Sequence, residues 1–259
     1  MRLPLFENAG AQSGFTGEVP SAEETERGVS VIVLGPPGSG KGTQASLLSE
    51  RFGLPHVSTG DMLRDRILVG DGFGKEIAER IDVGRFVPDE WINRLLDERL
   101  GLRDCRYGAI LDGYPRTLAQ AERFWERASV AGHTVVVGRL QASEETLVQR
   151  FAGRRQCSCC GALFHLSYQP SLAGEQCDRP GCIGNLEQRT DDRPEYVARR
   201  LADFEELTAP VIEFLKSRVA RFASVDAGGT PEEISEQILA CILPWTRVSG
   251  AAEDAGPAL

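Results

Sequence analysis

The residue pattern most suited to chemistry is a glycine-rich loop, GPPGSGKGT, at residues 35–43. It follows a short apolar run and precedes a helical pattern, which is the setting of a phosphate-binding loop. The glycines of such a loop let backbone N–H groups surround phosphate oxygens, and the helix N-terminus adds partial positive charge. Lys41 is spaced to reach the outer phosphates of a nucleotide, so we predict phosphate binding here rather than a turn without a ligand.

The loop departs from the common pattern at the residue after the lysine. Gly42 stands where a serine or threonine usually binds Mg²⁺, and Thr43 follows one position later. Magnesium held through water, phosphates and a carboxylate fits this loop better than a direct hydroxyl ligand. Asp112, at the end of an apolar strand, is our candidate for organising that water shell, with Asp61 as a second candidate. The alternative for Asp112 is a capping or turn residue. The departure argues against GTPases and motor-type NTPases.

A second set of reactive side chains lies in one short stretch, which holds five of the seven cysteines. Four of them have the spacing Cys157-x2-Cys160 and Cys177-x4-Cys182, close to that of a ribbon that binds Zn²⁺ through four thiolates. Four thiolates leave no open coordination position, so we predict a structural zinc rather than a catalytic one.

The remaining cysteines have simpler interpretations. We expect Cys159 to be a spare thiol turned outward and the isolated Cys105 and Cys241 to be inert. His165 is an alternative zinc ligand, and a disulfide is the alternative to metal. Because the N-terminus resembles neither a secretory signal nor a basic transit peptide, we expect the cytoplasm, where thiols favour metal over disulfides.

Short apolar runs alternate with amphipathic segments along most of the chain. The runs predict buried strands at residues 30–34, 109–111, 134–137 and 222–225. The amphipathic segments predict helices at residues 42–52, 88–100, 118–131, 144–151, 194–219 and 231–243. This alternation predicts an α/β fold, a parallel sheet with helices on both faces. Residues 153–192 break the pattern and predict an inserted subdomain.

Composition limits the class of protein. With 259 residues, 41% of them hydrophobic, the chain can bury a sizeable core, and it has no apolar run long enough to span a membrane. A net charge of −9 disfavours broad binding to nucleic acid or anionic membranes. We expect residues 1–28 to be a flexible extension and residues 249–259 a flexible tail.

Four further segments carry a resemblance to a known family. They are VSTGDMLR at 57–64, VPDE at 87–90, LDGYPRT at 111–117 and GRR at 153–155. With the glycine-rich loop, they make the chain between about 29 and 243 resemble the adenylate kinases, in the long form that carries a lid. The resemblance implies a P-loop nucleoside monophosphate kinase fold and the reversible transfer of the ATP γ-phosphoryl group to AMP, giving two ADP. It also implies Mg²⁺ with ATP, a zinc-ribbon-like lid and a monomer.

The resemblance implies a role for particular segments and residues. It divides residues 29–248 into a core (29–57, 88–152 and 193–248), an AMP-binding helical insertion (58–87) and a lid (153–192). On the ATP side it places Gly38, Ser39, Gly40, Lys41, Gly42, Thr43, Arg150 and Arg154. On the AMP side it places Thr59, Arg64, Arg85, Phe86, Val87, Gly113, Tyr114, Pro115, Arg116, Gln120, Arg189 and Arg200.

The chemistry of phosphoryl transfer agrees with this set. The acceptor phosphate attacks directly, so the protein supplies positioning and charge neutralisation rather than a nucleophile. Several arginines with planar guanidinium groups suit that task. We therefore assign catalysis to Lys41, Arg116, Arg150, Arg154, Arg189, Arg200 and Asp112. Asp191 and Asp192 either orient the lid arginines or cap the helix expected from residue 194.

Two other functions remain open at this point. A nucleoside monophosphate kinase with another acceptor base, or with GTP as donor, would need only a few different contacts to the base. A zinc-ribbon module that binds nucleic acid and keeps the loop as a nucleotide sensor is the alternative from another class.

Overall fold

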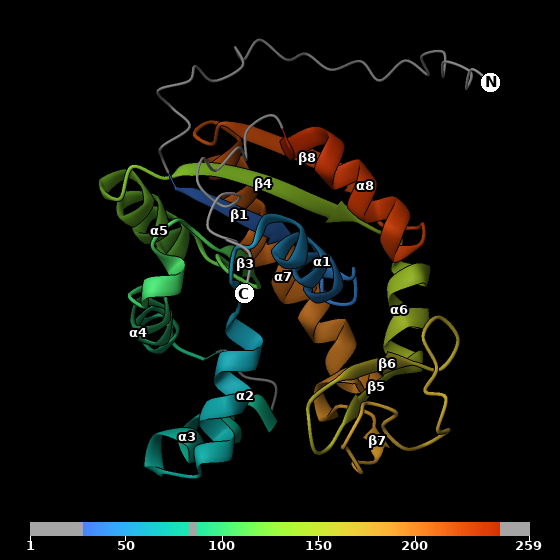
Figure 1. Ribbon diagram of the computed structural model, residues 1–259. Coiled ribbons are helices and arrows are strands. Elements are labelled where there is room, and N and C mark those ends of the chain that lie inside the picture. Colours follow the sequence, from blue (N-terminus) through green and yellow to red (C-terminus); the bar gives the residue numbers. More distant parts are fainter. Residues whose placement is uncertain (1–27, 83–86, 244–259) are drawn as a thin grey trace, which may run out of the picture.

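The computed structural model describes residues 28–82 and 87–243 and is built around a five-stranded parallel sheet (Figure 1). The strand order is β2-β3-β1-β4-β8. The strands are β1 (Val29–Leu34), β2 (His56–Ser58), β3 (Ile110–Asp112), β4 (Thr134–Gln141) and β8 (Arg221–Asp226). Because all pairs are parallel, the carboxyl ends of the strands meet at one edge, where such sheets bind ligands.

The central strand β1 shows why the sheet is buried on both faces. All six of its residues are buried, and its β-branched side chains suit a pleated core. Val31 and Val33 pack toward α1 (Lys41–Phe52) and α8 (Pro231–Ile242). Ile32 and Leu34 face the opposite way, toward α4 (Asp89–Leu100), α5 (Leu118–Val130) and α7 (Pro194–Lys216). The predicted arrangement of helices on both faces is therefore confirmed.

Two insertions project from the ligand-binding edge of the sheet (Figure 1). The first contains α2 (Thr59–Val69) and α3 (Gly72–Asp82), which pack on each other through a small apolar cluster. The second follows α6 (Glu144–Gly153) and holds an antiparallel sheet in the order β6-β5-β7. Its strands are β5 (Arg154–Cys157), β6 (Leu163–His165) and β7 (Leu186–Glu187). Single-turn 3₁₀ helices lie at Arg103–Cys105 (η2) and Thr190–Asp192 (η3).

The four predicted strands and six predicted helices are all present, with ends that differ by a few residues. Asp112 is the last residue of β3, as expected. The sequence did not predict β2, because three residues are too short to show a period. Nearly all of the expected extension at 1–28, and all of the tail at 249–259, lie outside the described residues. Within the described ranges, no helix combines the length and apolarity needed to cross a bilayer.

Gly108 allows the loop before β3 to approach β1, and it provides a test of the packing of the sheet. Its φ is +112°, and a Cβ atom there would lie 1.7 Å from the Val29 carbonyl oxygen. We expect Gly108→Ala to lower the free energy of unfolding by about 3 kcal/mol, from overpacking and left-handed backbone strain together. Denaturant unfolding measures the loss.

Gly132→Ala is the matched control. Gly132 also has a positive φ, +68°, but a Cβ atom there meets nothing within 4 Å. Only the backbone strain applies, so the expected loss is about 1 kcal/mol. Equal losses for the two variants would contradict a close contact between the Gly108 loop and β1.

Candidate functional site

The glycine-rich loop leads from β1 into α1 at the carboxyl edge of the sheet. Gly38 and Gly40 have φ of +84° and +94°, which side chains rarely tolerate. A Cβ atom at Gly38 would also lie only 3.0 Å from the Phe151 ring. Lys41 Nζ donates a hydrogen bond of 2.9 Å to the Pro36 carbonyl oxygen, so the lysine folds back over its own loop.

Asp112 lies close to this loop, and its position explains why residue 42 is a glycine. A Cβ atom at Gly42 would be 3.3 Å from Asp112 Oδ2, so a serine or threonine there would crowd the carboxylate. The His56 ring also lies nearby, with its Nε2 3.7 Å from Oδ2. Within the described residues no lysine or arginine forms an ion pair with Asp112. A free carboxylate beside a phosphate loop fits an Mg²⁺ ion held through water.

A cleft opens between the loop, the segment after β3 and helix α7. Its lining residues are Val33, Leu34, Gly35, Pro37, Lys41, Gly113, Pro115, Arg116, Arg200, Asp203, Phe204 and Thr208. The structure thus brings Lys41, Arg116 and Arg200 together from three separate elements. The sequence did not identify the α7 residues Asp203, Phe204 and Thr208, and their only signal was the helical spacing from Arg200 along one face.

Positive charge dominates the electrostatics of the cleft. Desolvation lowers the pKa of Lys41 to about 7, and although Asp112 opposes the shift, Arg116 and Arg200 add to it. Desolvation and the neighbouring Arg200 also lower the pKa of Arg116. Within the described residues neither Lys41 nor Arg116 has an ion-pair partner. Cations that repel one another in a desolvated cleft form a site for a polyanion.

Two carboxylates hold the lid arginines. Arg154, at the start of β5, grips buried Asp192 with two parallel hydrogen bonds, of which Nε–Oδ2 is 2.6 Å. Arg200 lies 3.0 Å from Asp191 Oδ2 and 3.2 Å from Asp192 Oδ1. Both guanidinium groups also stack over the Phe151 ring. Asp192 caps no helix, because Arg193 occupies the position before α7; the predicted alternative of arginine orientation is the correct one.

The two remaining arginines predicted for the ATP side and the lid are Arg150 and Arg189, and each contacts a different part of the protein. Arg150, on α6, donates to the carbonyl oxygens of Ser39 at 3.1 Å and Ala227 at 2.6 Å. It therefore joins the glycine-rich loop to the segment after β8. Arg189 donates to Gln156 Oε1 in β5 at 2.7 Å. Desolvation, with repulsion from Arg64 and Arg154, lowers the pKa of Arg189 to about 10.

The predicted AMP-side residues gather where β3 meets the first insertion. Thr59, at the start of α2, donates to the Gly113 carbonyl oxygen at 3.0 Å, and Arg116 Nε donates to the same oxygen at 3.0 Å. Arg64 pairs with Asp61 one helical turn earlier. Gln120 is only 2% exposed and accepts a hydrogen bond from the Arg116 backbone N–H at 2.8 Å.

The other residues predicted for this side have different surroundings. Tyr114 is buried, precedes Pro115 through a cis peptide bond, and donates its hydroxyl to Asn93 Oδ1 at 2.9 Å. Val87 is buried in the apolar cluster of the first insertion. Arg85 and Phe86 lie outside the described residues.

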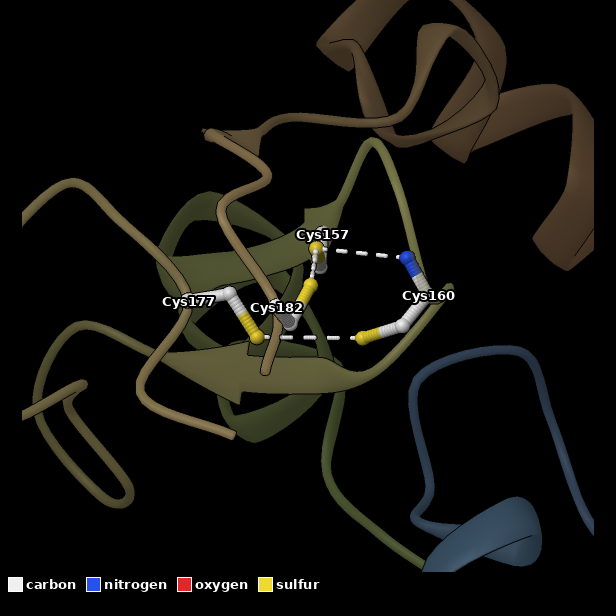
Figure 2. Close-up of side chains that lie close together, drawn as sticks. All are labelled: Cys157, Cys160, Cys177 and Cys182. Atoms are coloured by element: carbon white, nitrogen blue, oxygen red, sulfur yellow. Dashed lines mark hydrogen bonds between the residues drawn. The ribbon is translucent and has the colours of Figure 1, made fainter. Parts of the chain in front are cut away.

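The four predicted zinc ligands converge in the second insertion, and Figure 2 shows their side chains pointing toward one another. All four sulfur atoms lie within 4.8 Å of one another. The Cys157–Cys182 sulfur distance is 3.5 Å and the Cys160–Cys177 distance is 3.7 Å. Tetrahedral Zn²⁺ with Zn–S bonds of about 2.3 Å requires sulfur separations of about 3.8 Å. The residues present therefore fit a structural zinc.

Backbone geometry prepares this cluster for metal. The N–H groups of Cys160 and Cys159 point at Cys157 Sγ, each at 3.4 Å. The Cys160 N–H contributes most to lowering the pKa of Cys157 to about 6, against the opposing effect of burial. Cys159 itself is exposed, as predicted. The described cluster of candidate ligands consists of the four cysteines and does not include His165, whose Nδ1 accepts from the Ser167 and Tyr168 N–H groups.

A parallel sheet whose glycine-rich loop and cations converge on one cleft defines a P-loop protein that handles nucleoside phosphates. The sequence model described as adenylate kinase matches residues 33–220. A relative from Geobacter sp. (strain M21), named adenylate kinase, is 42% identical over 215 residues, covering 83% of this chain and 99% of its own. Adenylate kinases of Symbiobacterium thermophilum and Archaeoglobus fulgidus are each 43% identical, covering 73% of this chain and 87% of theirs. The chain belongs to the adenylate kinase family.

Zinc content tests the cysteine cluster. We expect the purified protein to hold about one zinc ion per chain, because four thiolates saturate a tetrahedral site. Cys182→Ser should lose most of that zinc to a competing chelator, and proteases should then cut between residues 153 and 192, since the bound metal supplies folding energy to the lid. Elemental analysis and limited proteolysis measure the two effects.

Cys159→Ser is the control, because Cys159 lies in the same turn but its sulfur is not part of the four-sulfur cluster. It should keep its zinc and its resistance to proteolysis. Equal zinc content in the Cys182→Ser and Cys159→Ser proteins would contradict a site made of these four sulfurs.

Proposed function

We propose that the cleft at the carboxyl edge of the sheet transfers the γ-phosphoryl group of ATP to AMP, reversibly and with two ADP as products. The protein is a member of the adenylate kinase family, and this is that family's reaction. The single observation that carries the assignment of the site is the convergence of Lys41, Arg116 and Arg200 on the glycine-rich loop, where, among the described residues, neither Lys41 nor Arg116 has an ion-pair partner. Such a cleft needs phosphate groups to balance its charge.

The donor side takes the triphosphate of ATP. Gly38, Ser39, Gly40, Lys41, Gly42 and Thr43 hold its phosphates, with backbone N–H groups and the N-terminus of α1 as donors. Arg150 braces the loop through the Ser39 carbonyl oxygen, and Arg154 reaches the phosphates when the lid closes. Mg²⁺ bound with ATP neutralises part of the phosphate charge, and Asp112 would hold its water shell, with Asp61 as a second candidate.

The acceptor side takes AMP between the first insertion and the segment after β3. Thr59 and Arg116 already donate to the Gly113 carbonyl oxygen, and Arg64 pairs with Asp61 on the same helix as Thr59. These three residues hold the nucleotide phosphate. Gln120 contacts the base. The remaining residues of this side are Arg85, Phe86, Val87, Gly113, Tyr114 and Pro115.

Transfer itself needs no protein nucleophile, because the AMP phosphate attacks the γ-phosphorus in line. Arg116, Arg189 and Arg200 neutralise the charge on the transferring group. Arg154 and Arg200 are bound to Asp191 and Asp192 in this structure, so lid closure exchanges those carboxylates for phosphate oxygens. Closure also excludes water, which would otherwise accept the phosphoryl group.

The proposal extends to domain organisation and setting. The core consists of 29–57, 88–152 and 193–248, the AMP-binding insertion of 58–87 and the lid of 153–192. Membership of the adenylate kinase family supports a monomer. The net charge of −9 supports a protein without nucleic-acid or membrane partners. The seven free cysteines, four of them arranged for metal, support a reducing compartment such as the cytoplasm.

ADP formation with a panel of acceptors tests this function. Purified protein with Mg·ATP is assayed against AMP, CMP, UMP, GMP and no acceptor. We expect AMP to exceed each other acceptor about tenfold or more in kcat/KM, since recognition of a base by buried polar groups discriminates strongly. Arg116→Ala should lower kcat about a hundredfold, because it removes a charge that stabilises the transition state.

Arg94→Ala is the control for the arginine variant. Arg94 is an exposed residue of α4 that pairs only with Glu98 on the same helix, and its loss should leave turnover unchanged. Turnover with a different monophosphate would overturn the adenine assignment. No transfer to any acceptor from folded, zinc-bound protein would overturn the enzymatic function.

The lowered pKa of Lys41 leads us to expect that the protein takes up a proton when ATP binds. Its pKa is about 7 in the free protein, and nearby phosphates favour the charged form and raise the pKa. Above the free pKa the lysine is mostly neutral, so binding near pH 8 should take up close to one proton. Near pH 6 the lysine is already charged, and the uptake should vanish. Calorimetric titrations in two buffers of different ionisation enthalpy measure the proton number.

Lys41→Arg serves as the comparison, because arginine stays protonated throughout this range. The difference in proton uptake between the two proteins isolates the lysine from the titration of ATP itself. No difference between them near pH 8 would show that Lys41 is already charged in the free protein.

A further inference from the structure

Asp89, the first residue of α4, lies at the centre of a polar network, and the reaction described above gives Asp89 itself no role. Its Oδ2 accepts a hydrogen bond of 2.6 Å from the Thr117 hydroxyl, and its Oδ1 accepts one of 2.7 Å from Gln120 Nε2. Thr117 caps the N-terminus of α5 and in turn accepts from the Gln120 backbone N–H. The carboxylate therefore lies at the N-termini of both α4 and α5, where helix dipoles favour negative charge.

This network determines which way the Gln120 amide points. The amide oxygen accepts from the Arg116 backbone N–H at 2.8 Å, while the amide nitrogen donates to Asp89. A rotation by 180° would place the oxygen against the carboxylate and the NH₂ group against another N–H donor. Both contacts would then be repulsive, so only the observed orientation is compatible with a charged Asp89.

The fixed amide still has hydrogen-bonding capacity for a ligand. A primary amide offers two N–H donors and two oxygen lone pairs, and the protein uses one of each. One N–H and one lone pair remain, in a defined arrangement. Adenine matches that arrangement, because its 6-amino group donates and its ring nitrogens accept. A 6-oxo purine presents an acceptor at the same position and would require the rotated amide.

We propose that Asp89 is a positioning residue that sets the base preference of the acceptor site by holding the Gln120 amide in the orientation that adenine requires. The inference rests on the proposed function, in which Gln120 contacts the base of AMP. Asp89 lies two residues after the end of the AMP-binding insertion, so it also ties the end of that insertion to the segment after Arg116. Asn93, one turn further along α4, adds a second tie through the Tyr114 hydroxyl.

The test compares AMP with IMP, which differ at the 6-position of the purine. Asp89→Asn keeps the shape of the side chain but removes the charge that enforces the amide orientation. We expect the ratio of kcat/KM for AMP over IMP to fall about tenfold, and the KM for AMP to rise by a similar factor, as loss of a charge-assisted hydrogen bond does. The KM for ATP should stay within about twofold, because the donor site shares none of these contacts.

Asp97→Asn is a matched control. Asp97 lies two turns further along the same helix and also ties α4 to α5, through Arg123 and Arg127. The Asp97→Asn variant loses one negative charge from the contact between α4 and α5, as Asp89→Asn does. The ion pairs of Asp97 are with Arg123 and Arg127, neither of which is assigned to the acceptor site. The nucleotide preference and both KM values of this variant should equal those of the wild type.

The outcomes separate this inference from the function on which it rests. Wild-type protein that fails to use AMP overturns the proposed function itself. If the wild type is active, an AMP:IMP ratio that is the same in Asp89→Asn and Asp97→Asn overturns the role of Asp89 alone. An equal rise in the KM values for ATP and AMP would show a general packing role and would likewise overturn it.

A second variant covers the case in which Asp89→Asn does not fold, which thermal unfolding reports. Thr117→Val keeps the carboxylate but removes one of its two anchors. The AMP:IMP ratio should then fall about threefold, in the same direction as for Asp89→Asn. A ratio unchanged from the wild type would overturn the proposal.

Discussion

The constraint on which the rest of this structure depends is the repulsion among cations held at one edge of the sheet. Lys41, Arg116 and Arg200 come from three elements and meet in a cleft where desolvation already disfavours their charges. The β-branched strands and two-sided helical packing form a scaffold rigid enough to hold them there. In this structure Asp191 and Asp192 neutralise part of the positive charge by forming ion pairs with Arg154 and Arg200. In the mechanism that we propose, phosphates replace those carboxylates, so substrate binding and movement of the lid draw on the same electrostatic free energy.

A carboxylate lies close to the point where each insertion rejoins the core. Asp192 ends η3, two residues before α7, and Asp89 begins α4, which follows the insertion that we propose binds AMP. Each anchors a group that serves the cleft: Asp192 binds Arg154 and Arg200, and Asp89 binds the amide of Gln120. Their partners differ in character. Asp192 binds guanidinium groups, which in the proposed mechanism leave it for phosphate, whereas Asp89 binds neutral groups at two helix N-termini.

Local pattern was enough to predict most of the fold, but not the pairings that make the site work. The run at 30–34 and the amphipathic helices have their own periods, so they could be assigned without knowledge of their neighbours. Strand β2 has three residues and no period, and it is defined only by pairing with β3. The motifs predicted which arginines matter. They did not predict that Arg154 would bind a residue 38 positions away, or that Asp89 would bind a threonine 28 positions away, because such contacts follow from tertiary packing.

The lid shows why a metal belongs to this fold. Its apolar cluster consists of Ala162 and Phe164 with buried cysteines, while Leu172 and Ile183 are about nine-tenths or more exposed. So little buried apolar surface cannot offset the conformational entropy of some forty ordered residues. Coordination by four thiolates supplies the missing stabilisation and joins the turn after β5 to the loop before β7. We propose that a lid held together in this way moves as one body. Arg154 and Arg189 would then reach the phosphates in a fixed relation to each other, which transition-state stabilisation by preorganised charges requires.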